Sequence, residues 1–209
     1  MPFSAADSRL QASPYGDRTL GRLPETPSQT AGPYVHIGLI PRQAGFEIFA
    51  RDIGAGGLAA DEPGERIRIE GRVLDVTGSL VRDALVECWQ ARADGTHGIF
   101  GRTGTSFETG LWGFDTVRPG AVPARGGKAR MAPHVSLWLA ARGLNRGLHT
   151  RLYFGDCEEA NAADPVLRLI EQPNRRATLV AARTERDGVP VFTLDIRLAG
   201  EGETVFLDP

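Results

Sequence analysis

The chain has 209 residues, of which 41% are hydrophobic, and it carries a formal net charge of -2 at pH 7. This apolar fraction can build a real core, while so small a charge gives no electrostatic attraction for nucleic acid or a membrane surface. The 26 Gly and 14 Pro are too many for a helix bundle and suit turns between short strands. Since no run of 18 apolar residues occurs, no membrane-spanning helix is expected.

The N-terminal region divides into two parts. Residues 1–22 lack the basic start and apolar core of a signal peptide, and we expect them to form a flexible extension. The next part, LPETPSQTAGPYVHIGLIP, contains Pro24, Pro27 and Pro33, which argue against a helix. The residues YVHI after Pro33 are strand formers. We therefore expect an ordered, extended arm that packs against another surface.

The remaining sequence is dominated by short strand patterns that end in Gly or Pro turns. In chain order they are RIRIEGRVLD from residue 66, LVRDALVECWQAR, GLWGFDTVRPG, HVSLWLAARG, its expected antiparallel neighbour LHTRLYFG, and VFTLDIRLAG. Two stretches are predicted to be helical: DPVLRLIEQ, with an Asp cap and a Pro at its first position, and RATLVAAR. This order predicts an all-β domain over residues 23–209, an antiparallel β-sandwich or barrel with short peripheral helices.

Two cysteines, Cys88 and Cys157, provide no disulfide framework, which fits a reducing cytoplasm. Cys88 lies within an apolar strand pattern, where a buried free thiol is the usual outcome. The stretch GAGG at residues 54–57 lacks the strand–turn–helix context of a phosphate loop and is expected to be a mobile loop.

The stretch MAPHVSLWL raises the question of a metal site, because a strand would place His134, Ser136 and Trp138 on one face. A second histidine at position 136 would bring two imidazoles to one point, but Ser136 stands there. No two of the four histidines are spaced i+2 or i+4, and no zinc or calcium motif occurs; the histidines are His36, His97, His134 and His149. From the residues alone, His134 is therefore better interpreted as a structural residue than as a metal ligand.

Arg142 ends the same strand, before Gly143, where its planar fork is well placed to bind a carboxylate. Taken alone, however, an arginine at a strand end is more often a solvated charge. Tyr34 has two possible roles as well, as a packing residue or as part of a pocket wall. From the residues alone, the chain is a cytosolic β-sandwich that binds a partner or a small molecule.

Seven stretches in order resemble the intradiol ring-cleaving dioxygenases of aromatic catabolism, in particular the alpha chains of their two-chain members. They are TPSQTAGPYVHIGL, GRVLDVTGSLVRDALVECWQARADG, GRTGTSFETGLWGFDTVRPG, MAPHVSLWLAARGL, HTRLYF, EQPNRRATLVAAR and GEGETVF, and the resemblance runs from about Leu23 to the C-terminus. It implies a β-sandwich and an oligomer with a homologous beta chain. That beta chain holds a non-haem Fe(III) through two tyrosinates and two histidines, hard donors that suit ferric iron. The implied substrates are 3,4-dihydroxybenzoate and O2.

The resemblance also implies that this chain has lost the metal site. The two histidine positions fall on His134 and Ser136, and one tyrosine position falls on Val122. The insertion that carries the other tyrosine is shortened here to RADGTHGIFGR, which has no tyrosine. We therefore expect the Fe(III) to be bound by the partner beta chain and not by this chain, which alone would have no catalytic residue.

The family's substrate-pocket wall, carried over to this sequence, comprises Thr30, Gly32, Pro33, Tyr34 and Arg142. A glycine lets backbone approach a ligand closely, and Arg142 would neutralise the carboxylate of the substrate or instead tie the alpha and beta chains together. Two alternatives remain open: a free-standing active dioxygenase, and a non-enzymatic, transthyretin-like sandwich that binds small molecules or proteins.

Overall fold

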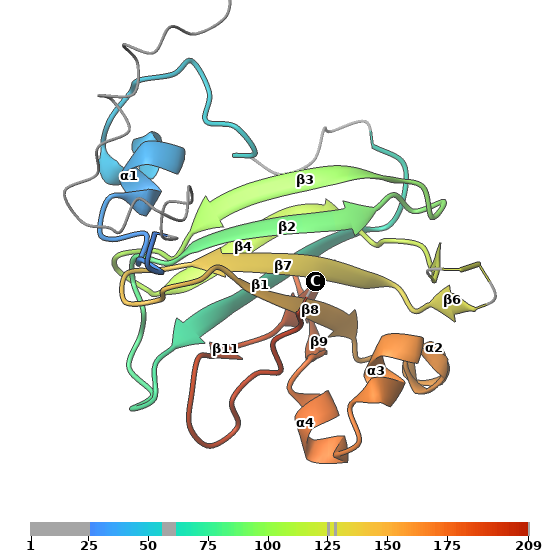
Figure 1. Cartoon of the computed structure of the whole chain (residues 1–209). Helices are drawn as coiled ribbons and strands as arrows, with labels where there is room; N and C mark the ends of the chain where they lie inside the picture. The colour runs from blue at the N-terminus through green and yellow to red at the C-terminus, as the bar shows by residue number, and fades with distance from the viewer. Residues whose placement is uncertain (1–25, 56–61, 125, 128, 209) are drawn as a thin grey trace, which may run out of the picture.

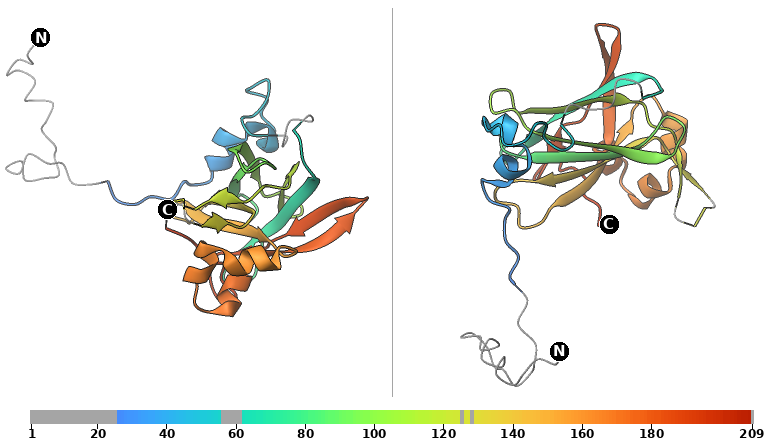
Figure 2. Two further views of the ribbon diagram at one scale, coloured as in Figure 1. Left: turned by 90° about the vertical axis from the view of Figure 1, so that its right-hand side faces the viewer. Right: turned by 90° about the horizontal axis from the view of Figure 1, so that it is seen from above.

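The computed structural model describes residues 26–55, 62–124, 126–127 and 129–208. The predicted flexible extension, residues 1–22, and the second half of the GAGG loop, residues 56–57, lie outside the described residues. The described part of the chain is mainly β-structure, with short helices at its periphery (Figure 1 and Figure 2). This confirms the predicted all-β class.

Within the described residues, nine strands form one sheet that curls over on itself, in the order β11-β1-β10-β9-β8-β7-β2-β3, with β4 paired to β1. Their bounds are β1 Arg66–Leu74, β2 Leu85–Ala91, β3 His97–Gly104, β4 Leu111–Val117, β7 His134–Ala140, β8 Leu148–Phe154, β9 Val180–Arg186, β10 Val189–Thr193 and β11 Ile196–Arg197. A separate two-stranded ribbon pairs β5 Val122–Pro123 with β6 Arg130–Met131. In Figure 1, β3, β2, β7 and β8 form one layer, and β4 and β1 lie behind it.

Most neighbouring strands run antiparallel, and β8 is the antiparallel neighbour of β7, as predicted. Three pairs are parallel, however: β1 with β10, β1 with β11, and β8 with β9. Parallel neighbours require a long crossover connection. Residues 155–179, which carry three helices, provide that connection between β8 and β9.

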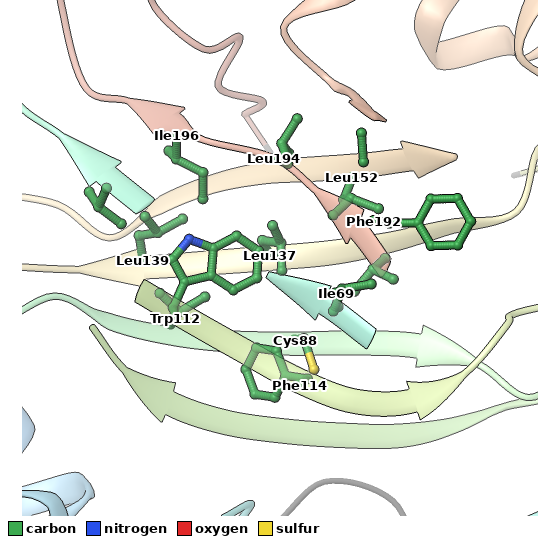
Figure 3. Packing of buried hydrophobic residues seen from close by; sticks show 14 of the residues in the cluster. Ile69, Cys88, Trp112, Phe114, Leu137, Leu139, Leu152, Phe192, Leu194 and Ile196 are labelled. Atoms are coloured by element: carbon green, nitrogen blue, oxygen red, sulfur yellow. The ribbon is translucent and has the colours of Figure 1, made fainter. Parts of the chain in front are cut away.

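The core lies between the two layers, because the strands alternate as their sequences predict. In β7, Val135, Leu137 and Leu139 are buried, while every second residue faces outward. Figure 3 shows Leu137 packed near Trp112, Phe114 and other residues of the opposite layer. Cys88 is also buried there as a free thiol, as expected.

The close approach of the chain at Leu194 to β1 depends on glycine at one position of β1. A Cβ atom on Gly71 would lie 1.8 Å from the carbonyl oxygen of Leu194, so no larger residue fits there without moving the backbone. Gly71 is also opposite Trp112 across the β1–β4 pair, and the indole fills the space beside it.

Five short helical segments surround the sheet: α1 Val35–Leu39, the 3-10 helix η3 Pro41–Ala44, α2 Glu158–Ala163, α3 Pro165–Leu169 and α4 Pro173–Ala177. The prediction of α3 is confirmed, since the Asp164 side chain accepts hydrogen bonds from Val166 N and Leu167 N at its start. Among the described residues, no helix is long and apolar enough to cross a membrane.

Two local predictions were wrong. The strand formers after Pro33 fold into α1, because a proline that precedes a helix breaks none of its hydrogen bonds. The stretch RATLVAAR, residues 176–183, is helical only at its start, and from Val180 it forms β9 between β8 and β10. Pairing on both sides overrides the helix propensity of its alanines.

Candidate functional site

The outer face of β7 carries His134 and Ser136, both partly exposed. The Nδ1 atom of His134 lies 2.8 Å from the carbonyl oxygen of Ala132, which can only accept, so Nδ1 carries the proton in this contact. The imidazole also packs against Tyr153 on β8, with ring centroids 5.6 Å apart. His134 is therefore held by its own strand start and by the neighbouring strand.

The three positions that the resemblance assigns to a lost metal site come together in space. Val122, His134 and Ser136 line one hollow of ≈ 240 Å³, together with Trp89, Gln90, Ala91, Gly98 and Gly120. This hollow offers one imidazole, one hydroxyl and an aliphatic side chain that is 2% exposed. Such a donor set does not fit ferric iron, which takes phenolate and imidazole donors. Within the described ranges, no group of three His, Cys, Asp or Glu side chains could hold a metal.

The turn between β2 and β3 closes the edge of this hollow. Arg92 N donates to Thr96 O over 2.6 Å, and Gly95 N donates to Arg92 O over 3.0 Å. Asp94 accepts hydrogen bonds from the backbone and hydroxyl of Thr96, which lower the pKa of its carboxyl group. Gly120 N also donates to Arg92 O, so the turn is tied to the segment before Val122. The segment between β2 and β3 is thus a tight, hydrogen-bonded turn.

The N-terminal arm docks on the turn that follows β7, at both sides of Arg142. Thr30 Oγ1 donates to Ala141 O at 3.4 Å and accepts from Gly143 N at 2.9 Å. Ser28 Oγ extends the contact by donating to Asn145 O at 2.8 Å. The structure therefore brings Thr30 and Arg142 together, although 111 residues or more separate the bonded partners in the chain.

The other residues of the candidate pocket wall are partly or largely exposed. Gly32 adopts φ 72°, a left-handed conformation that favours glycine, and nothing lies within 4 Å of where its Cβ would be. Pro33 is exposed, and Tyr34 is 73% exposed at the N-cap of α1. The Arg142 side chain is 66% exposed. In this chain the five residues form an open edge, so a second surface is needed to enclose a ligand.

A second hollow of ≈ 350 Å³ adjoins the first on the outer face of the sheet. It is lined by Leu39, Glu87, Trp89, Ser136, Leu137, Trp138 and His149, so Trp89 and Ser136 border both hollows. Trp89 is 56% exposed, and the sequence analysis did not single it out. The alternation of β2, which turns Glu87 and Trp89 outward, is the signal that could have found it.

Comparisons with known proteins show what this chain is similar to. A family model described as "Dioxygenase" matches residues 54–200. The protocatechuate 3,4-dioxygenase alpha chain of Pseudomonas putida is 52% identical over 196 residues, which is 89% of this chain and 97% of the relative. The alpha chain from Burkholderia cepacia is 37% identical over 201 residues, 89% and 98% of the two chains. The corresponding beta chain from Burkholderia cepacia is 35% identical over 135 residues, 56% of each chain.

Solved structures share the fold at low sequence identity. The dioxygenase domain of a carbohydrate-binding fusion protein from Streptomyces sp. SirexAA-E has a TM-score of 0.52 and 19% identity, and covers 85% of this chain and 99% of that one. An intradiol ring-cleavage dioxygenase from Tetranychus urticae has a TM-score of 0.52 and 16% identity, with 71% and 88% covered. The chain belongs to the intradiol ring-cleavage dioxygenase family. Within that family, its similarity to the alpha chains of protocatechuate 3,4-dioxygenase extends over nearly its whole length.

Proposed function

We propose that this chain is the alpha subunit of a protocatechuate 3,4-dioxygenase. The enzyme would open 3,4-dihydroxybenzoate with O2 to 3-carboxy-cis,cis-muconate, in the beta-ketoadipate pathway of aromatic catabolism. The observation that carries this proposal is 52% identity to an alpha chain over 89% of this sequence. Its partner would be the homologous beta chain, and the free thiols of Cys88 and Cys157 are in keeping with a reducing cytoplasm.

In this proposal the ferric iron belongs to the beta chain. The support is the chemistry of the hollow beneath His134, where Ser136 and Val122 stand at positions that would need an imidazole and a phenolate. Ferric iron in the partner would supply the activation of the catechol for reaction with O2. This chain alone would then be inactive. In the complex, its residues would contact the substrate beside the iron of the beta chain.

The contribution of this chain is a wall for the substrate pocket, made by Thr30, Gly32, Pro33, Tyr34 and Arg142. The open edge that these residues form is the geometry expected of half a pocket. Thr30 fixes the arm against the turn, and the bare backbone at Gly32 admits a ligand closely. Arg142 would bind the carboxylate, the group that distinguishes protocatechuate from catechol.

Arg142→Ala in the assembled enzyme tests this role. Loss of a hydrogen bond to a charged group costs about 1.5–3 kcal/mol, so kcat/KM for 3,4-dihydroxybenzoate is expected to fall about 10- to 100-fold. Iron content, measured by metal analysis, should not change. Arg146→Ala is the matched control, because Arg146 is an exposed arginine on the same turn. Unchanged kinetics in the Arg142 variant would refute the assignment.

His134→Ala tests the location of the iron. Iron content per alpha–beta pair should be the same as in the wild type, whereas loss of iron would show that this chain binds the metal. Two further outcomes address the alternatives. Iron bound by this chain alone, with the purple-red colour of tyrosinate coordination, would favour a free-standing dioxygenase. Failure to assemble with a beta chain from the same organism would favour a transthyretin-like binding module.

A further inference from the structure

Arg142 forms an ion pair with a residue that sequence reasoning did not connect to it. Its Nε atom lies 3.3 Å from Oδ2 of Asp83, in the turn before β2. The two side chains differ in exposure: that of Asp83 is 17% exposed, against 66% for Arg142. The carboxylate of the pair is thus largely buried, whereas the arginine side chain is largely exposed to solvent.

Asp83 stands on a rigid part of the backbone. The next residue, Ala84, is fully buried and exchanges two hydrogen bonds with Thr105: Ala84 N donates to Thr105 Oγ1 at 3.1 Å, and Thr105 N donates to Ala84 O at 2.9 Å. The preceding residue, Arg82, donates from Nη1 to the carbonyl oxygens of the turn at residues 107–108. The Asp83 carboxylate therefore projects from a segment whose neighbouring residues are both anchored.

The backbone of Arg142 is fixed as well, since Thr30 Oγ1 bonds to the residues on either side of it. The side chain approaches Asp83 through Nε, on one edge of the guanidinium group. A guanidinium group carries five N–H donors in a planar fork, so the edge formed by its two terminal nitrogens can bind a second carboxylate in a bidentate manner.

We propose that Asp83 is a positioning residue for Arg142: it holds the guanidinium group so that its terminal nitrogens face the carboxylate of the substrate. This inference rests on the proposed role of Arg142 in the pocket wall. Fixing a long, exposed side chain before the substrate arrives removes part of the entropy cost of binding, which amounts to about 0.5–1.5 kcal/mol, or about 3- to 10-fold in affinity, for one such side chain.

Asp83 also has an opposing effect, which makes the proposal easy to test. Its negative charge lies close to Arg142 and weakens the attraction of the arginine for a substrate anion. If that effect dominated, removal of the charge would improve binding. If positioning dominates, removal of the charge weakens binding. The direction of the change therefore decides between the two.

The experiment uses the assembled alpha–beta enzyme with Asp83→Asn and Asp83→Glu in this chain. We expect Asp83→Asn to raise KM for 3,4-dihydroxybenzoate about 3- to 10-fold with kcat within about twofold, and Asp83→Glu to restore part of the loss. The inhibition constant of the neutral analogue 3,4-dihydroxybenzamide should not change. Asp115→Asn is the matched control, because Asp115 pairs with Arg68 at 2.9 Å on the opposite layer of the sheet.

A KM that is unchanged or lower in Asp83→Asn would overturn the positioning role. An equal rise in the inhibition constant of the neutral analogue would also overturn it, because it would mark a general disturbance of the pocket. Arg142→Ala, measured in parallel, distinguishes a failure of the positioning role from a failure of the proposed pocket wall. If that variant loses affinity and Asp83→Asn does not, only the positioning role fails. If neither does, the proposed pocket wall fails.

Discussion

Replacing Asp164 with Ala is expected to destabilise the fold by about 3–8 kcal/mol. The Asp164 side chain is completely buried between α3 and the start of β7. Its Oδ1 accepts from Val166 N at 2.8 Å, Leu167 N at 2.9 Å and the Tyr153 hydroxyl at 3.1 Å. Its Oδ2 accepts from Ala132 N at 2.8 Å.

The magnitude follows from these four donors. Loss of an N-cap costs about 0.5–2 kcal/mol. The Ala132 amide and the Tyr153 hydroxyl would each lose a buried acceptor, at about 1–3 kcal/mol apiece. Asp164→Asn should cost less, because its oxygen can still serve the three donors at Oδ1 while its amide group opposes the Ala132 N–H.

Equilibrium urea unfolding, followed by circular dichroism, measures both variants against the wild type. Glu47→Gln is the control, since that side chain is 84% exposed and should leave the midpoint unchanged. A loss below about 1 kcal/mol for Asp164→Ala, the value of a cap alone, would show that Ala132 and Tyr153 find other acceptors and would refute the reasoning.

Two further predictions concern ionisation. Hydrogen bonds from Arg186, and then from Arg68, hold the pKa of Glu70 below its ordinary value of 4.5; the resulting stability is present above that value and is lost as pH falls through the lower folded pKa. Glu70→Gln should therefore flatten the fall of the melting temperature between about pH 5 and 3, and an unaltered acid slope would contradict this. Burial raises the pKa of the Cys88 thiol to about 12, so iodoacetamide at about pH 8 should modify the half-buried Cys157 and spare Cys88 in the native protein. Peptide mass spectrometry measures this, and equal labelling of both thiols would show that the core opens readily.

The sequence predicted those parts of the fold whose pattern is local. Alternation placed β7 and β8 correctly, and the Asp–Pro pair placed the start of α3. The strand β3 was missed because its glycines look like turn residues. Gly101 is needed there, because a Cβ atom would come within 2.8 Å of Phe114 and 2.9 Å of Cys88. Such a requirement comes from side chains on the neighbouring strand β2 and on β4, and it leaves no periodic signal in β3 itself.

The candidate site divides in a similar way. Family resemblance supplied Val122, His134 and Ser136, and in the structure these residues line one hollow. Family resemblance could not identify Asp83 as the partner of Arg142. That ion pair depends on how two turns that are distant in the chain fold together. The parallel strand pairs of the sheet were not predicted for the same reason, because no local pattern encodes which distant strands meet.

The clasp between Thr30 and the turn after β7 sets a rule for redesign of this protein. One hydroxyl joins the arm to both neighbours of Arg142, so a change in the length of either segment displaces the other. Transplanting residues 28–34 from a relative without its residues 141–145 would put at risk the hydrogen bonds that join the two segments. A graft that keeps these hydrogen bonds must therefore move both segments together.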